Sequence, residues 1–134
     1  MHISASILNT GQQNEIKVTT NKAEKKINIP PKSEGKGSSV NGGELLFLAL
    51  ATCFCNDIYR EAAKRQLEVK SVEVMVSGEF GGEGEPGFNI QYETKVDADA
   101  TEDEIRDLIV FVDKVAEVHN TLRTGTPVTL KATH

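Results

Sequence analysis

The sequence predicts a single α+β domain, because short strands and a hairpin flank a buried helix and a second, amphipathic helix. The buried helix is indicated by a dense apolar run over residues 45–55. The hairpin is indicated by two alternating stretches, 69–80 and 88–96. A length of 134 residues suits one domain with one core, so we expect one domain over 1–134.

Three short strands are expected ahead of the buried helix. Their partly alternating stretches are 3–8, 15–20 and 25–29. Thr10-Gly11 and Asn21-Lys22 are turn signals between them, which predicts a three-stranded meander. Pro30-Pro31 ends the meander, and the polar stretch 32–39 predicts a loop.

The first helix starts at a recognisable cap. Asn41 is a good N-cap residue, and Glu44 stands three residues later, where a capping-box partner belongs. Residues 45–55 leave no polar face, so this half is expected to be buried on every side. From Asn56 the pattern becomes amphipathic, which predicts that the C-terminal half emerges toward solvent.

The hairpin and the second helix follow. The strands 69–80 and 88–96 should pair antiparallel across the Gly-rich loop 81–87. Thr101 and Glu104 form a second capping box, after which apolar residues recur at helical spacing. The helical pattern weakens at 118–120, a short turn follows, and 127–131 is expected to form a last strand.

Composition excludes several classes of function. A net charge of −5 disfavours nucleic acid, which is bound by basic side chains. The first residues lack the pattern of a signal peptide, and the apolar run is too short to span a membrane. Two cysteines do not make a disulfide framework. We therefore expect a cytoplasmic protein without nucleic-acid or membrane partners.

Cys53 is the candidate for chemistry. A cysteine inside an apolar helix is usually a small hydrophobic residue, and this interpretation stays open. A reactive thiolate needs a nearby cation, whereas Arg60 lies two turns away and Asp57 would oppose ionisation. Cys55 points away from Cys53, so it is interpreted as core and is not expected to pair with Cys53 in a disulfide or a metal site.

The histidines do not indicate a metal site. His2, His119 and His134 show no ligand spacing with the cysteines or with each other, so no metal and no cofactor are expected. His119 sits where the second helix loosens. It is either an exposed C-terminal residue favoured by the helix dipole or a residue that faces Cys53 and tunes it.

Two stretches resemble the OsmC/Ohr family of hydroperoxide-resistance proteins. They are Gly42-Gly43-Glu44-Leu45-Leu46 running into Ala49-Leu50-Ala51-Thr52-Cys53-Phe54, and the later Ala116-Glu117-Val118-His119-Asn120-Thr121-Leu122. The family has Pro-Glu-Gln-Leu-Leu with Ala-Ala-Cys-Phe in the first and Cys-Pro-Val-Ser-Asn-Ala-Leu in the second. The strand pair between them also fits, so the similarity covers essentially the whole chain.

The resemblance implies an OsmC-like fold in which antiparallel sheets from two intertwined chains wrap central buried helices, with active sites at the dimer interface. It also implies a reaction. A cysteine thiolate, poised by an Arg and a Glu, attacks a peroxide and becomes a sulfenic acid. A second cysteine then condenses with it to a disulfide, which an external dithiol reduces.

The family pattern transfers only in part. Cys53 falls on the peroxide-attacking position, and Ala116 stands where the second cysteine belongs. Glu44 lies one residue beyond the expected Glu, and no Arg precedes Arg60. Glu44, Ala116, His119 and Arg60 are therefore possible site-lining residues. The proline that follows the second cysteine is also missing, which predicts that the second helix continues past Ala116.

Three functions compete. The first is a one-cysteine peroxidase that reduces small organic peroxides with an external thiol and uses Cys53. The second is a non-catalytic homodimer that binds a small apolar ligand in its interface pocket. The third is a structural dimer in which Cys53 is core.

Overall fold

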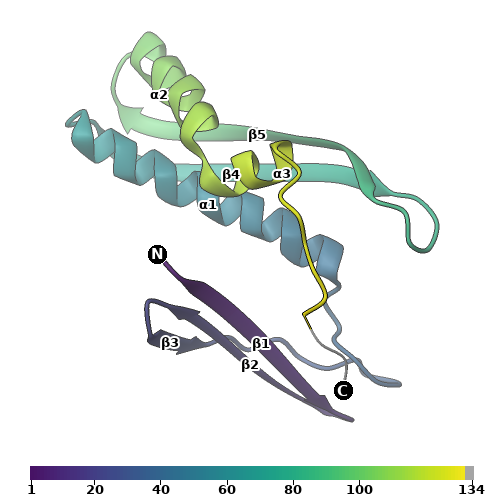
Figure 1. Ribbon diagram of the computed structural model, residues 1–134. Helices are drawn as coiled ribbons and strands as arrows, with labels where there is room; N and C mark the ends of the chain where they lie inside the picture. The colour runs from purple at the N-terminus through teal and green to yellow at the C-terminus, as the bar shows by residue number, and fades with distance from the viewer. Residues whose placement is uncertain (132–134) are drawn as a thin grey trace. The chain divides into compact units, whose positions relative to one another are not determined.

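The computed structural model of the chain describes residues 1–131 (Figure 1). Its elements, in order, are β1 (Ile3–Thr10), β2 (Gln13–Thr20), β3 (Ala23–Lys26), α1 (Gly42–Lys64), β4 (Glu68–Phe80), β5 (Gly87–Asp99), α2 (Glu102–Val115) and α3 (Glu117–Arg123). The predicted α+β class is confirmed. Two compact units make up the chain, Met1–Leu45 and the part from residue 46 onward, and α1 begins in the first and runs through the second.

The first unit is the predicted meander, a three-stranded antiparallel sheet in the order β1-β2-β3. The third strand is β3, not the predicted 25–29. It begins earlier because Asn21 and Lys22, both at positive φ, turn the chain so tightly that Ala23 already pairs with Thr20. Ile27 adds one more bond to β2 before the chain leaves toward Pro30.

Helix α1 begins at the predicted capping box. The Asn41 side chain accepts a hydrogen bond from the Glu44 backbone N–H at 2.8 Å, and the Glu44 carboxylate accepts one from the Asn41 N–H at 2.9 Å. Each bond satisfies a donor that the first helical turn leaves free. This local signal places the helix start correctly.

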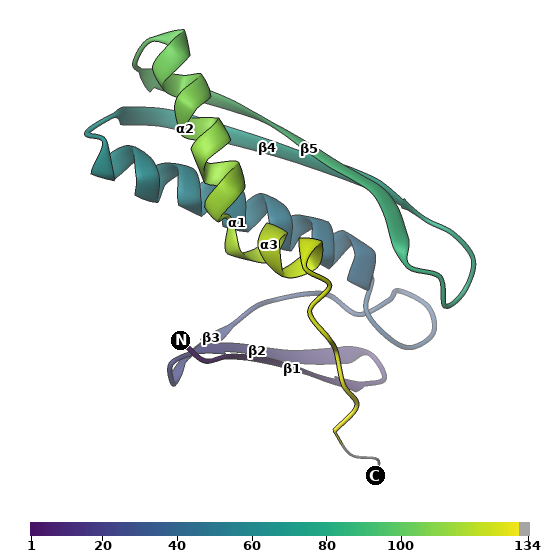
Figure 2. The same ribbon diagram turned by 45° about the horizontal axis from the view of Figure 1, so that its top comes forward.

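In the second unit, β4 and β5 form the predicted antiparallel hairpin, with Val74 opposite Thr94 near its middle. The register shifts between Val69 and Ser71 and between Ser77 and Glu79. Alternate residues of β4 are half-buried, as the pattern indicated. Both Figure 1 and Figure 2 show α1 running along this hairpin.

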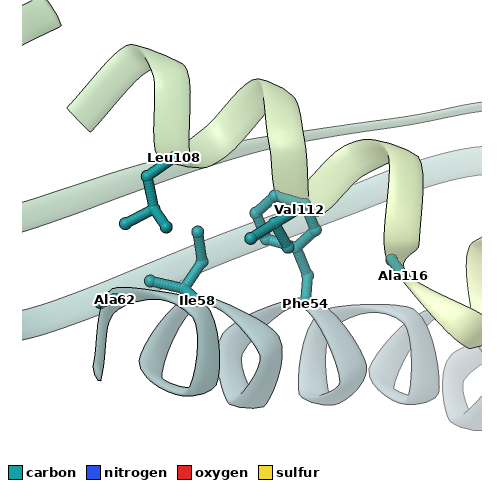
Figure 3. Packing of buried hydrophobic residues seen from close by; sticks show 6 residues of the cluster. All are labelled: Phe54, Ile58, Ala62, Leu108, Val112 and Ala116. Carbon is teal, nitrogen blue, oxygen red and sulfur yellow. The ribbon is translucent and has the colours of Figure 1, made fainter. Parts of the chain in front are cut away.

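The core lies where α1, α2 and the hairpin meet. Figure 3 shows Leu108 and Val112 of α2 pointing toward Ile58 and Phe54 of α1. All four side chains are fully buried. Half-buried residues of the hairpin pack against them, among them Val69, Val72, Val74, Tyr92 and Val96.

The sequence predicted that the N-terminal half of α1 is buried and that its C-terminal half faces solvent. Within the single chain this prediction is wrong. The C-terminal half carries most of the buried positions, including Asp57 and Glu61, because the hairpin and α2 cover it. In the N-terminal half, Leu48 is 60% exposed and Leu45 is 38% exposed. Composition identified this half as apolar but could not say what covers it.

The end of α2 also differs from expectation. The helix does not continue through Ala116, which adopts an extended backbone and separates α2 from α3. The last carbonyls of α2 find partners in α3 instead, because Asn120 donates to the Lys114 carbonyl and Arg123 donates to the Asp113 carbonyl. The break therefore needs no proline.

The last predicted strand is wrong, because residues 127–131 form neither helix nor strand. The sequence expectation for His134 falls outside the described residues. No helix among residues 1–131 is long and apolar enough to cross a membrane.

Candidate functional site

Cys53 lies half-buried on α1, opposite the start of α3. Its sulfur lies 3.8 Å from Asp57 Oδ2 and 3.9 Å from Glu117 Oε1, within donor reach of both carboxylates. Asp57 is one helical turn further along α1, on the same face as Cys53. The sulfur therefore sits between two acids rather than beside a cation.

Glu117 reaches the sulfur because of the break after α2. Ala116 is fully buried and extended, so α3 starts afresh with Glu117 as its first residue. Sequence reasoning missed Glu117, because a helix that continued through Ala116 gives no reason to place that side chain near α1. The family resemblance placed a proline there, which carries no charge.

Arg60 joins the two acids without approaching the sulfur. Its Nη1 lies 3.0 Å from Asp57 Oδ1 and 3.3 Å from Glu117 Oε2, while its Nε donates to Glu61 at 2.8 Å. Lys64 donates to the same Glu61 oxygen at 3.0 Å. Three carboxylates thus share the guanidinium, and no hydrogen bond joins it to Cys53 within residues 1–131.

The electrostatics of the site favour a protonated thiol. Burial raises the pKa of Cys53, and a hydrogen bond with the Val118 backbone partly opposes that rise. The negative charges of Asp57 and Glu117 raise the pKa further, so the net shift is upward. The pKa of Asp57 is itself raised to about 6, first by burial and then by its hydrogen bond and repulsion with Glu117. An acid with that pKa is largely ionised at neutral pH yet can still take up a proton.

The three ligand atoms of Cys53, Asp57 and Glu117 lie within 4.8 Å of one another, a spacing that could also hold a metal ion. Arg60 already supplies a positive charge to both carboxylates of this group. With its charge balanced by Arg60, the pair of carboxylates is placed to accept a proton from the Cys53 sulfur.

Two other predicted site residues have roles in the fold. Glu44 is engaged in the cap of α1. Ala116 belongs to the core cluster against which Cys53 packs. Cys55 was expected to be a core residue. It is instead half-buried, like Cys53, and lines a hollow of about 250 Å³ together with Val72 and Val74 of β4. Both cysteines are free thiols.

His119 is not exposed, so the expectation of a solvent-facing residue at the end of the second helix is wrong. It is only 4% exposed, with its ring 4.7 Å from that of Tyr92 and 5.7 Å from that of Phe54. Neither ring nitrogen has a hydrogen-bond partner among residues 1–131. The helical pattern could not reveal this burial, because the covering ring of Tyr92 comes from β5.

Comparison with known proteins finds similarity to OsmC-like proteins. The family model described as OsmC-like protein matches residues 35–131. A comparison with curated protein sequences finds no significant match.

Solved structures give the same result. An OsmC-like protein from Mycoplasma pneumoniae is 21% identical, with a TM-score of 0.61 over 93% of this chain and 87% of its own. An organic hydroperoxide resistance protein OsmC from Legionella pneumophila is 19% identical, with a TM-score of 0.56 over 92% and 90%. The organic hydroperoxide resistance protein OhrB of Bacillus subtilis is 15% identical, with a TM-score of 0.55 over 93% of each chain. At these identities the likeness shows a shared fold.

Proposed function

Because the chain belongs to the OsmC-like protein family, we propose that it is a thiol-dependent reductase of organic hydroperoxides, with Cys53 as the attacking residue. The observation that supports this most is the position of the Cys53 sulfur, half-buried and within 4 Å of two carboxylate oxygens. The Legionella and Bacillus neighbours are named for hydroperoxide resistance, which agrees with this reaction.

The carboxylates suggest how a protonated thiol could react. As the sulfur attacks the outer peroxide oxygen, an S–O bond forms and the O–O bond breaks. The thiol proton passes to Asp57, whose pKa of about 6 suits a general base at neutral pH. The same proton then neutralises the leaving alkoxide, so the products are a sulfenic acid and an alcohol.

The catalytic cycle would need an external thiol. Ala116 occupies the position at which the family resemblance places a second cysteine, and Cys55 faces β4 instead of α3. An external thiol would condense with the sulfenic acid, releasing water and forming a mixed disulfide. A second thiol would then restore Cys53 and carry away the oxidised reductant.

We further propose that the working form is a cytoplasmic homodimer. Large apolar side chains are exposed on β1, on the first half of α1 and on α2, namely Ile3, Ile7, Leu8, Leu48, Val110 and Phe111. Isolated apolar residues on a surface are ordinary, whereas several large ones on the same elements are typical of a surface that a partner covers. A second copy of the chain would cover them, and a reducing compartment would keep both thiols free.

The test is direct trapping of the intermediate. The purified protein is mixed with cumene hydroperoxide and dimedone, and the adduct is located by mass spectrometry. We expect a dimedone adduct on Cys53 in the native chain and in Cys55→Ser, and none in Cys53→Ser. If Cys53 remains a thiol under excess peroxide while the protein stays folded, the proposed reaction is refuted.

A second function is favoured by one observation, the upward shift of the Cys53 pKa by burial and by its acidic neighbours. A thiol of this kind also suits a non-catalytic dimer that binds a small apolar molecule at its interface. That function predicts an unreactive Cys53 together with an increase in Tm when an apolar peroxide such as cumene hydroperoxide is added.

A further inference from the structure

A separate cavity of about 240 Å³ lies between α1, β5 and α3 in the second unit. It is lined by Leu50, Ile90, Tyr92, His119, Leu122 and Arg123. Three of these six side chains are aliphatic and Tyr92 adds an aromatic ring, so most of the wall is apolar. The volume falls below the roughly 300–1,000 Å³ of drug-sized pockets, which limits the occupant to a small molecule.

His119 is the unusual residue in this wall. Its side chain is almost entirely buried, and neither Nδ1 nor Nε2 meets a polar partner in the described part of the chain. Buried polar atoms are normally paired, because leaving one unpaired forfeits its hydrogen bonds to water. A neutral imidazole offers one hydrogen-bond donor and one acceptor. Both are therefore free to bind a ligand in the cavity.

Arg123 supplies a charge at the same cavity. Its side chain is 48% exposed, so it stands at the rim rather than in the interior. Nη2 donates to Asp113 Oδ1 at 2.8 Å and Nη1 donates to the Asp113 carbonyl at 2.8 Å. A guanidinium carries five N–H donors, and these contacts leave the Nε–H uncommitted to any described residue.

We propose that this cavity binds a short-chain carboxylate, with the hydrocarbon chain against Leu50, Ile90 and Leu122 and the carboxylate at Arg123 and His119. A carboxylate matches the planar guanidinium and accepts a hydrogen bond from the imidazole. Both ring nitrogens are shielded from solvent while the residue lines the cavity, so binding requires the imidazole to reorient until one nitrogen reaches the ligand. The site is independent of the peroxide chemistry, because its lining includes neither Cys53 nor its acidic neighbours.

The probe is hexanoate, titrated into the full-length protein by calorimetry. We expect saturable binding with a Kd on the order of 1 mM or tighter, as ligand efficiencies allow for so small a molecule. Hexanol has the same hydrocarbon chain without the charge. Its Kd should be at least about tenfold higher, because it loses the charged contact with Arg123. If hexanol binds as tightly as hexanoate, the proposal that the cavity recognises a carboxylate is refuted.

Variants assign the binding to this cavity. Arg123→Gln should weaken hexanoate binding at least about fivefold and leave the weaker binding of hexanol unchanged. Arg106→Gln, which removes an exposed arginine of α2 outside the cavity, is the matched control and should bind normally. Hexanoate binding that survives Arg123→Gln at full strength would overturn the proposal.

Two further measurements separate this site from the rest of the molecule. The ring-proton NMR signals of His119, assigned by their loss in His119→Phe, should shift and saturate with the calorimetric Kd. Cys53→Ser should bind hexanoate as the native chain does, whether or not Cys53 reacts with peroxide. Unshifted His119 signals at saturating hexanoate would place the ligand elsewhere and refute the site.

Discussion

The Cys53 sulfur lies 3.9 Å from Glu117 Oε1, so the thiol that we propose as the attacking group faces a carboxylate from the start of α3. Asp57 brings a second acid to the same sulfur at 3.8 Å. Negative charge beside a thiol opposes its ionisation. The site is consequently built for a protonated sulfur with a proton acceptor at hand, in contrast to the cation-poised thiolate that the family resemblance implies.

Glu117→Gln should make Cys53 more reactive toward iodoacetamide. The substitution removes one of the charges that raise the pKa of Cys53, so more thiolate exists at a given pH. Because Glu117 is 60% exposed and screened by solvent, we expect alkylation near neutral pH to accelerate only about two- to fivefold. Glu102→Gln on α2 is the control. An unchanged alkylation rate would mean that Glu117 does not act on the sulfur.

Asp57→Asn separates the two roles of this acid. Native Cys53 should react with peroxide faster as the pH rises through about 6, where Asp57 becomes ionised and able to accept the thiol proton. The variant should lose that rise and react about tenfold more slowly near neutral pH, although its alkylation becomes faster. Rates of Cys53 oxidation by cumene hydroperoxide across the pH range provide the measurement. A variant that reacts faster with peroxide would mean that Asp57 only suppresses the thiolate.

Local signals in the sequence placed the elements well. The capping boxes at Asn41 and Thr101 start α1 and α2 where expected, because each depends on residues only three positions apart. The hairpin could also be predicted, since alternation requires no knowledge of distant contacts.

The site could not be predicted in the same way, because its contacts join distant segments. Glu117 meets Cys53 because Ala116 breaks the helix, and side chains from beyond the break, Asn120 and Arg123, bond the last carbonyls of α2. His119 is buried by an aromatic ring of β5. Helical periodicity identifies the apolar positions of α1, yet it cannot say that Leu48 remains exposed within one chain.

Leu48→Glu tests the dimer. Leu48 is 60% exposed in the single chain, so a charge there should leave the fold intact but would be buried against a second copy. We expect the native chain to be a dimer by light scattering after gel filtration and the variant to be largely monomeric, with unchanged far-ultraviolet circular dichroism. Gln66→Glu adds the same charge just beyond the end of α1 and should remain dimeric. A folded, dimeric Leu48→Glu protein would exclude this surface from the interface.

Thr101→Ala tests the contribution of the second capping box. The Thr101 hydroxyl accepts a hydrogen bond from the Glu104 N–H at 3.1 Å, and the Glu104 carboxylate accepts one from the Thr101 N–H at 3.0 Å. Losing the cap should lower the free energy of unfolding by about 1 kcal/mol, measured by urea denaturation. Thr101→Ser keeps the hydroxyl and should be nearly neutral. Equal losses in both variants would mean that the hydroxyl bond contributes nothing.

The burial of His119 should make the protein less stable as the pH falls. Burial lowers the pKa of His119, and the nearby positive charge of Arg123 lowers it further, although Asp113 acts in the opposite direction. The unfolded chain therefore takes up a proton at about pH 6.5, whereas the folded chain resists it until lower pH. Stability should fall as the pH drops through that window, by up to about 1.4 kcal/mol per pH unit.

His119→Leu isolates this contribution, because the remaining groups titrate in both proteins. Asp57 has the opposite sign, since its raised pKa of about 6 makes the folded state bind a proton more readily and gain stability as the pH falls through 6. The pKa of Asp113 is lowered by its hydrogen bonds to Tyr92 and Arg123. Protonation of Asp113 therefore destabilises the fold only at more acidic pH than this window. Urea denaturation between about pH 5 and pH 8 should show native stability falling relative to the variant below about pH 6.5. Parallel curves for the two proteins would mean that His119 is protonated as easily in the fold as in the unfolded chain.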